Sequence, residues 1–274
     1  MDLIALRTFV RVFSVVMMRR FILGSIATAA LLGGCMVGDT YNDLFGSVKK
    51  GPRVVVSGDA GTASAVAELR DLLGEPNNGV APGSFGVGRR EINWDAVPPT
   101  VTNVDNFPVG FFNSNSPRGA VLSTPGSGTR ISDNDFADIN PSYAGQFADF
   151  SPVKTFAAVG SNQMDVTFFV PGSPEKATVT GFGAVFSDVD GKGSSIQFFD
   201  DTGHLLIVVE PKKGKEGFSF AGVVFETPVV ARVRLTLGDG PIGPDAFDVK
   251  AGGNQDLVVV DDFFYGEPQG TGLQ

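Results

Sequence analysis

The stretch Asp188-Val189-Asp190-Gly191 has the residue types best suited to holding a metal ion. Calcium binds several oxygen ligands, and carboxylates at alternate positions before a glycine supply the first of them. An Asp-Gly pair between two apolar runs is also a strong signal for a hairpin turn. The sequence therefore supports two interpretations of this stretch: a hairpin turn alone, or a turn that also holds calcium.

A helix-flanked calcium loop does not fit the residues that follow. Its fifth and twelfth positions would be a lysine and a phenylalanine, and neither offers a carboxylate. In a β-protein the missing ligands would come from the end of another strand, and Asp261 and Asp262 are the candidates. If the turn holds calcium, we predict Asp188, Asp190, Asp261 and Asp262 as its ligands.

Asp261 and Asp262 interrupt an otherwise apolar strand over residues 257–264. Alternation along a strand sends one of two neighbours toward the interior, where an unpaired carboxylate is costly. Three arrangements relieve that cost. They are a bound metal, an arginine partner such as Arg232 or Arg234, or a hydrogen-bonded turn outside the sheet.

Glu91 and Asp95 flank Trp94, and two carboxylates beside an aromatic ring suit glycoside hydrolysis. On a strand, however, residues four apart lie about 13 Å from each other, which exceeds the separation that this chemistry uses. We therefore expect a buried Trp94 whose neighbouring acids pair with Arg89 or Arg90. A glycan-directed hydrolase stays as the less favoured hypothesis.

Two further motifs are set aside. Residues 238–243 match the letters of the G-x-G-x-x-G fingerprint, but Pro241 and Pro244 indicate a loop where a dinucleotide site needs a helix. His204 is the only histidine and lies beside a predicted turn, so a zinc site with several histidines is excluded. We expect no nucleotide or redox cofactor.

The aromatic residues favour a dry core over a sugar-binding surface. The chain has 24 Phe but only one Trp and three Tyr, and the rings of Trp and Tyr carry the polar group that wet sites use. A carbohydrate-binding module is therefore an alternative hypothesis, with Trp94, Tyr143 and Tyr265 as its candidate contacts.

The N-terminus resembles a bacterial lipoprotein signal. Arg19 and Arg20 precede the apolar run 21–32, and small residues follow just before Cys35, the only cysteine. The run is shorter than the roughly 20 residues that span a bilayer. The resemblance implies a signal peptide over residues 1–34, lipid on Cys35, and export to the cell envelope, at the outer membrane or cell surface. Residues 35–52 are the expected tether.

Charge narrows the choice of partners. Residues 1–34 hold four of the 21 basic and one of the 30 acidic residues, so the remaining chain has a net charge of −12. Nucleic acid is excluded as a partner because its binding depends on Lys and Arg neutralising phosphates. The expected partners are the membrane, through the lipid, and a glycan or another envelope protein.

The periodicity of apolar residues predicts one short helix and many strands. Val66, Leu69 and Leu73 recur at helical spacing over 64–73, and Gly74 suits the C-terminal cap. Turn residues dominate 75–153, which we interpret as ordered covering loops with short strands at 91–96 and 119–123. Later segments alternate regularly. The predicted later strands are 164–170, 177–189, 194–199, 204–210, 217–226, 229–237 and 256–265.

These elements predict an all-β fold. Strands with one apolar face must bury it against a second sheet, so residues 53–274 should form a single antiparallel β-sandwich domain. We favour a jelly-roll-like topology over a closed barrel.

Several motifs resemble a group of uncharacterised bacterial secreted proteins. Their C-terminal half is similar to the β-sandwiches found ahead of PEP-CTERM sorting signals. The resemblance implies a fold and an exported location but no activity, so we expect a non-catalytic binding or structural module. The residues that carry it are 76–79, 89–95, 111–113, 116–119 and 260–263.

Overall fold

The computed structural model describes residues 51–214 and 217–273. The predicted signal segment, Cys35 and residues 35–50 of the expected tether lie outside the described residues. Contacts divide the chain into residues 1–50 and residues 51–274. The described residues contain no helix of the length and apolar character that crossing a membrane requires.

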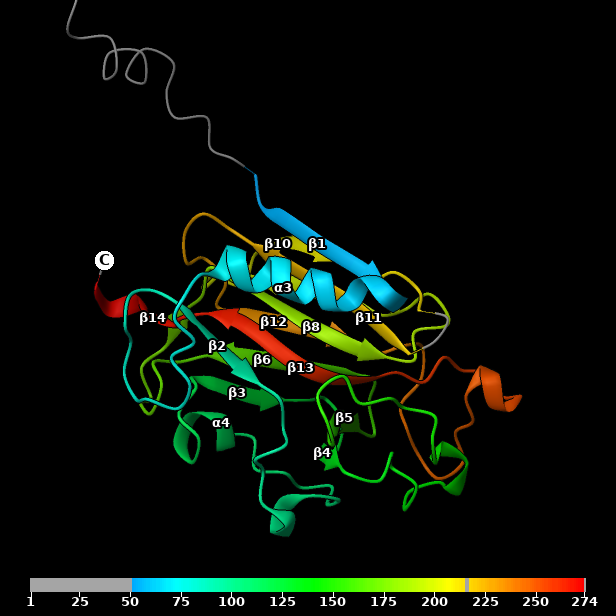
Figure 1. Ribbon diagram of the computed structural model, residues 1–274. Helices are drawn as coiled ribbons and strands as arrows, with labels where there is room; N and C mark the ends of the chain where they lie inside the picture. The colour runs from blue at the N-terminus through cyan, green and yellow to red at the C-terminus, as the bar shows by residue number, and fades with distance from the viewer. Residues whose placement is uncertain (1–50, 215–216, 274) are drawn as a thin grey trace, which may run out of the picture. The chain divides into compact units, whose positions relative to one another are not determined.

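Most of this unit is arranged in two antiparallel sheets (Figure 1). The larger sheet has the strand order β1-β11-β8-β13-β5-β4, and β2 also pairs with β13. Its strands are β1 (Arg53–Gly58), β2 (Arg89–Ile92), β4 (Gly128–Ser132), β5 (Thr155–Val159), β8 (Gly181–Ser187), β11 (Phe218–Val224) and β13 (Val259–Gly266). The smaller sheet has the order β10-β9-β12-β6-β3. Its strands are β3 (Ala120–Ser123), β6 (Gln163–Phe168), β9 (Ser195–Phe199), β10 (Leu205–Val209) and β12 (Arg232–Thr236).

The remaining elements are short. The strands β7 (Ala177–Thr178) and β14 (Gln269–Gly270) form a separate pair. The helices are α3 (Thr62–Leu73) and α4 (Phe111–Ser114), with 3-10 turns at Asp59–Gly61, Pro99–Val101, Pro141–Tyr143, Val249–Ala251 and Thr271–Leu273.

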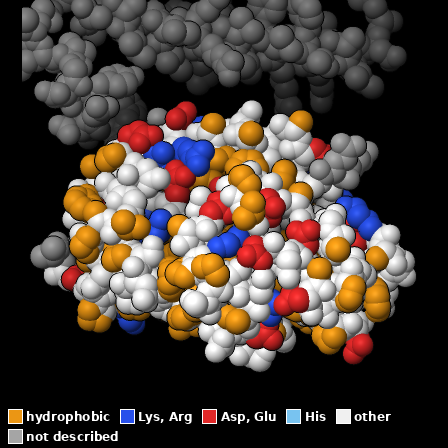
Figure 2. Space-filling view, turned by 60° about the horizontal axis from the view of Figure 1, so that its bottom comes forward, with side chains coloured by type: hydrophobic (Ala, Val, Ile, Leu, Met, Phe, Trp, Pro, Cys, Tyr) orange, Lys and Arg blue, Asp and Glu red, His pale blue; other side chains and the backbone are white. Residues whose placement is uncertain are grey.

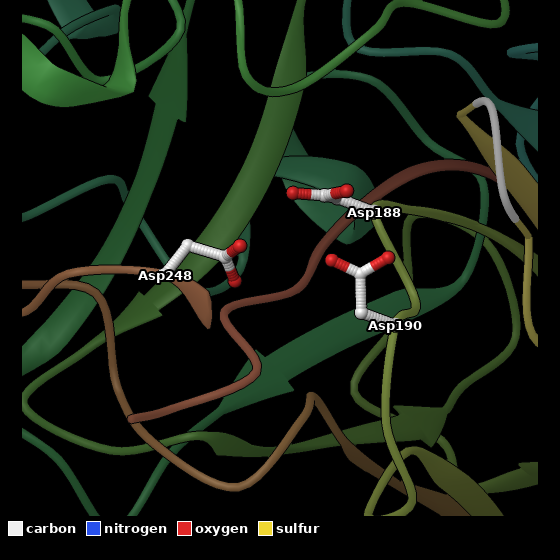
Figure 3. Close-up of side chains that lie close together, drawn as sticks. All are labelled: Asp188, Asp190 and Asp248. Atoms are coloured by element: carbon white, nitrogen blue, oxygen red, sulfur yellow. The ribbon is translucent and has the colours of Figure 1, made fainter. Parts of the chain in front are cut away.

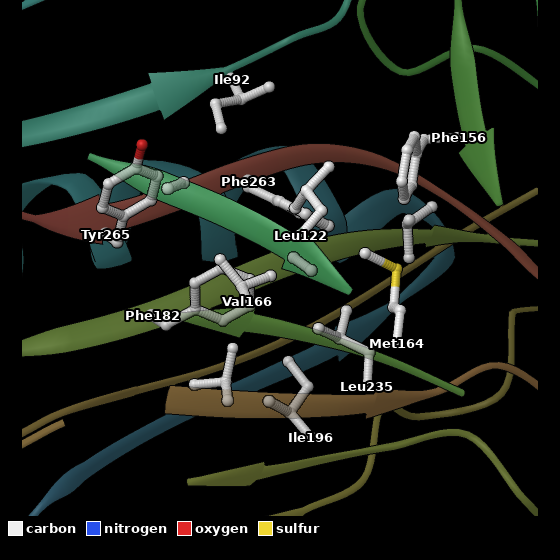
Figure 4. Packing of buried hydrophobic residues seen from close by; sticks show 14 of the residues in the cluster. Ile92, Leu122, Phe156, Met164, Val166, Phe182, Ile196, Leu235, Phe263 and Tyr265 are labelled. Carbon is white, nitrogen blue, oxygen red and sulfur yellow. The ribbon is translucent and has the colours of Figure 1, made fainter. Parts of the chain in front are cut away.

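The main core lies between the two sheets (Figure 4). Strand β6 shows how the sequence builds it: Met164, Val166 and Phe168 are fully buried and alternate with partly exposed residues. On β12, Val233 and Leu235 point inward in the same way, as their alternation predicts. The predicted antiparallel sandwich is confirmed.

The outer face of the larger sheet is covered as well. Helix α3 packs Val66, Leu69 and Leu73 on this face, against residues such as Phe220. The helix begins two residues earlier than predicted and ends at the predicted cap, Gly74, which has a φ of 88°.

The loop-rich segment covers another part of the same face. Phe136, Tyr143 and Phe147 form a third apolar cluster with Leu257 and Val259 of the larger sheet and its approach. The segment is therefore an ordered cover, as its aromatic residues predict. All three clusters lie within residues 51–274, so this unit has a complete core of its own.

The connections alternate between the sheets. The chain passes from the smaller to the larger sheet between β3 and β4 and between β10 and β11, and it returns between β5 and β6 and between β11 and β12. This alternation gives the predicted jelly-roll-like arrangement, and neither sheet closes into a barrel. On the face shown in Figure 2, acidic, basic and apolar side chains are interspersed.

Three local predictions need correction. The single strand expected over 177–189 is divided into β7 and β8, which lie in different sheets. The strand expected over 91–96 runs from Arg89 to Ile92, because Trp94 adopts a φ of 64° that a strand does not allow. The hairpin expected at the Asp-Gly pair does not form, because β8 lies in the larger sheet and β9 in the smaller. The segment between them crosses from one sheet to the other.

Candidate functional site

Three carboxylates meet at one end of the sandwich. Asp188, Asp190 and Asp248 each offer an oxygen, and these atoms all lie within 4.8 Å of one another (Figure 3). Asp188 directly follows β8 and has a φ of 69°, a left-handed conformation that aspartate tolerates better than most residues. The cluster could bind a metal ion.

Backbone hydrogen bonds hold this cluster in place. Asp248 caps the 3-10 turn that follows it, because one carboxylate oxygen accepts from the Lys250 amide at 2.7 Å. Its other oxygen accepts from the Leu257 amide at 2.9 Å. Asp256 accepts from the amides of Asp190 at 3.0 Å and Gly191 at 2.9 Å. The loop that carries Asp190 is thereby tied to the approach to β13.

A lysine is the counter-charge of the cluster. The Lys250 ammonium pairs with Asp188 and lies 3.1 Å from the Asp190 carboxylate. The second carboxylate oxygen of Asp190 is buried and has no hydrogen-bond partner among the described residues. The Lys250 side chain is 47% exposed, so it can leave the cluster for solvent without disturbing the core.

Burial governs the protonation of these groups. It raises the pKa of Asp188, and the neighbouring carboxylates of Asp190 and Asp248 raise it further, against the opposing effect of Lys250. Burial also raises the pKa of Asp256. Burial by itself lowers the pKa of Lys250, but its hydrogen bonds to Asp188 and Asp190 outweigh burial and raise it. Three carboxylates share one ammonium group, so the cluster has an excess of negative charge and favours a further cation.

An open cavity of about 470 Å³ borders the cluster. Its lining includes Gln146, Asp188 and Lys250, and the Gln146 side-chain amide donates to Asp188 at 3.1 Å. A cation can therefore reach the carboxylates from solvent.

Asp261 and Asp262 do not belong to this cluster, which corrects the predicted ligand set. They form a β-bulge in β13. Val260 faces Phe186 and Phe263 faces Ala184 on β8, so the two aspartates together oppose one residue. The bulge resets the alternation, so Val260 and Phe263 both reach the main core.

The two aspartates are held by the loop that follows Phe147 in the chain. Asp261 accepts from the amides of Phe150 at 2.5 Å and Ser151 at 3.2 Å. The Ser151 hydroxyl donates to Asp262 at 2.6 Å. The predicted arginine partners are wrong, because Arg232 and Arg234 both pair with Asp165.

Asp261 and Asp262 are both buried, and neither forms an ion pair with the Lys and Arg residues that the structure describes. Asp261 is fully buried and Asp262 nearly so. Burial, together with the negative charge of Asp262, raises the pKa of Asp261 to about 9. Burial also raises the pKa of Asp262, against the hydrogen bond from Ser151 and the charge of Arg70. At neutral pH the pair therefore keeps one proton, which we assign to Asp261.

Asp261→Asn should stabilise the protein at alkaline pH. Asp261 ionises near pH 4 in the unfolded chain and near pH 9 in the folded one. Its contribution to the free energy of unfolding is therefore fully present below about pH 4 and is lost as the pH rises toward 9. The asparagine side-chain amide carries its N–H groups at every pH, so it can donate to Asp262 without taking up a proton. We expect the variant to be more stable than the wild type at pH 8, by up to about 5 kcal/mol, measured by urea unfolding.

The two unfolding curves should converge as the pH falls toward 5. An exposed control, Asp71→Asn, should leave the pH dependence unchanged. Equal stability of the Asp261→Asn variant and the wild type from pH 5 to pH 9 would show that the pair holds no extra proton.

The other predicted acids are engaged in the structure. Glu91 binds Arg70 through two hydrogen bonds of 2.9 and 2.7 Å and also pairs with Arg89 at 2.7 Å. The expected pairing with Arg89 is confirmed. Asp95 instead accepts from the Val153 amide at 2.7 Å. Hydrolysis at Glu91 and Asp95 gains no support from this geometry.

The three aromatic residues considered for glycan binding lie in the interior. Trp94, Tyr143 and Tyr265 are at most 1% exposed, so they present no surface to a ligand. The Tyr143 hydroxyl donates to the backbone carbonyl of Gly243, and the Tyr265 hydroxyl to that of Arg118. Their role is in packing.

The two motifs set aside have structural roles. Residues 238–243 form a loop without a helix, and the Gly238 amide donates to Ser194 at 2.9 Å. His204 is exposed and lies beside the turn at Asp200, which accepts from the amides of Thr202 and His204 at 2.9 Å. The sequence missed Asp248, since a single aspartate before a short turn gives no sign of a distant partner.

Comparisons with known proteins add little to this description. No protein-family model matches the chain, and no curated protein matches it. Among solved structures, the chain is similar to the enzymatically active domain of tailspike protein 4 of Bacteriophage CBA120, at 17% identity and a TM-score of 0.26. The match covers 62% of this chain and 22% of that chain, so the chain corresponds to less than a quarter of the tailspike domain's length.

Proposed function

We propose that this protein is an exported, lipid-anchored, non-catalytic module of the bacterial cell envelope that binds calcium at Asp188, Asp190 and Asp248. The convergence of three carboxylates from two distant segments carries the proposal. A bound ion would tie the 188–191 loop to the 248–251 turn, and so serve a structural or binding role at this end of the sandwich.

The donor set favours calcium. It consists only of carboxylate oxygens, which suit hard cations, and it contains none of the nitrogen or sulfur ligands that zinc prefers. The unpartnered oxygen of Asp190 offers a ligand that needs no rearrangement. Lys250 must leave, and its exposure allows that.

The location rests on the N-terminal sequence. The order of basic residues, apolar run, small residues and Cys35 supports export and lipid attachment. Cys35→Ser should move the protein from the membrane fraction to the soluble fraction and abolish labelling by radioactive palmitate. A variant that stays membrane-bound and labelled would contradict the lipid anchor.

Calcium should stabilise the 51–274 unit. At free calcium of about one hundred times Kd, mass action adds about 2.7 kcal/mol to the free energy of unfolding. The melting temperature should therefore rise with calcium in the wild type. Asp190→Asn should abolish the rise, because it removes one carboxylate charge and its free oxygen from the cluster.

Two variants control this experiment. Asp71→Asn, on the exposed face of α3, should keep the full response to calcium. Lys250→Met should bind calcium more tightly in isothermal titration, because no tethered ammonium competes for Asp188 and Asp190. A wild-type melting temperature that does not move at millimolar calcium would refute the site.

A further inference from the structure

Strand β10 is an edge strand with an apolar surface. It ends the smaller sheet, and none of the described strands pairs with its outer edge. Leu205, Leu206 and Val208 are 52%, 36% and 44% exposed. Soluble proteins usually protect such an edge with charge or cover it, because its free backbone groups bind other strands.

Two other sheet edges in this unit are covered by the chain, and β1 is a further edge strand, whose Val54 is 47% exposed. The outer edge of β4 is covered by residues 103–107, since the Phe107 amide donates to the carbonyl of Thr129 at 3.0 Å. The edge at β3 is covered in part, because the Leu122 amide donates to the carbonyl of Val109 at 2.9 Å. Strand β1 begins with the charged Arg53. Strand β10 has no charged residue of its own.

The charges that flank β10 have opposite signs. Asp200 and Asp201 lie in the turn before the strand, and Glu210, Lys212 and Lys213 follow it, with a net positive charge. An antiparallel pair of two β10 strands would bring the acidic turn of one copy toward the basic segment of the other. A parallel pair would instead place like charges together. The edge is therefore complementary to itself in the antiparallel sense.

We infer that β10 is a homodimer interface, in which two copies pair antiparallel and join their smaller sheets. A two-fold axis requires one residue to face its own copy. Centring the pair on Ile207 places Leu206 opposite Val208, Leu205 opposite Val209, and His204 opposite Glu210 of the second copy. The exposed side chains of Leu206 and Val208 then lie side by side, whereas Leu205 meets the backbone at the buried Val209, and the flanking charges are opposite in sign.

The local geometry of β10 allows this pairing. A bulge between Leu205 and Ile207 interrupts the pairing with β9, but Ile207, Val208 and Val209 continue in regular register with it. A five-residue strand buries a small interface, so the dimer should be weak and depend on concentration.

Light scattering after size-exclusion chromatography tests the interface with the 51–274 unit, which has a complete core. The wild type should pass from monomer to dimer between micromolar and millimolar concentration. Val208→Lys should stay monomeric, with an unchanged melting temperature because the residue is exposed. Val109→Lys, at a similarly exposed valine elsewhere, should dimerise like the wild type.

Two further variants test the register. Residues 51–274 contain no cysteine, so Ile207→Cys should form a disulfide-linked dimer on mild oxidation, whereas Leu206→Cys alone should not. Lys213→Glu should weaken the dimer, and the double variant Asp201→Lys/Lys213→Glu should restore it. Recovery by the double charge swap requires that the two positions meet.

Three results would overturn the inference. They are a wild type that stays monomeric at every concentration, a dimer that survives Val208→Lys, and dimerisation of the 51–274 unit that disappears when residues 36–50 are present. The last result would show that the chain's own N-terminal segment covers β10.

Discussion

Arg90→Met will lower the free energy of unfolding by about 3–5 kcal/mol, because it leaves a buried carboxylate without its counter-charge. The Arg90 guanidinium is fully buried and binds Glu267 through two hydrogen bonds of 2.6 and 2.8 Å. It also donates to the backbone carbonyls of Gly79, Ala81 and Gly83 at 2.8–3.1 Å. One side chain therefore anchors the loop before β2 to the end of β13.

The loss should be larger than the pair itself contributes. Removing Arg90 leaves the buried Glu267 with only the hydrogen bonds from the Asn78 side chain and the Phe85 amide, and it leaves several backbone carbonyls without this donor. Both losses cost free energy. Urea unfolding of Arg90→Met, Glu267→Met and the double variant measures the coupling. The double variant should recover the part of the lost free energy of unfolding that comes from the unpaired carboxylate. It should not recover the part that comes from the backbone carbonyls, which still lack their donor.

An exposed arginine provides the matched control. Arg53 lies 3.9 Å from Glu68, with both side chains more than half exposed, so Arg53→Met should cost less than 1 kcal/mol. A cost for Arg90→Met that is no larger than the cost for Arg53→Met would contradict the anchoring role.

Trp94→Ala will cost about 3–5 kcal/mol, the usual price of removing a fully buried large aromatic ring. The indole stacks on Phe156 with ring centroids 4.4 Å apart and meets the edges of Phe112 and Phe263 at 5.4 and 5.0 Å. Its N–H donates to the carbonyl of Asp261 at 2.5 Å. The ring therefore fills the core and also ties down the bulge.

The variant Trp94→Phe separates these two roles. It keeps a ring in the core but leaves the Asp261 carbonyl without its donor, so we expect a smaller loss of about 1–3 kcal/mol. Trp94 is the only tryptophan, so wild-type fluorescence should be blue-shifted and resist quenching by acrylamide until the protein unfolds. A red-shifted, readily quenched native emission would mean that Trp94 is exposed.

Features that depend on neighbouring residues could be predicted from the amino-acid sequence. The alternation in β6 and β12 predicted inward and outward faces, because successive side chains on a strand point to opposite sides. The spacing of Val66, Leu69 and Leu73, with Gly74 after them, predicted α3 and its end. These patterns are local, so they do not depend on contacts with distant parts of the chain.

Contacts between residues far apart in the chain could not be predicted, because they depend on how the whole chain folds. The sequence predicts Asp188 and Asp190 as ligands, and the structure places Asp248 beside them because the approach to β13 passes the end of β8. The bulge at Asp261 and Asp262 depends on the register between β13 and β8, and that register follows from the packing of the whole core. Which residues pair across the fold depends on many weak contacts together, so a short stretch of sequence does not predict it.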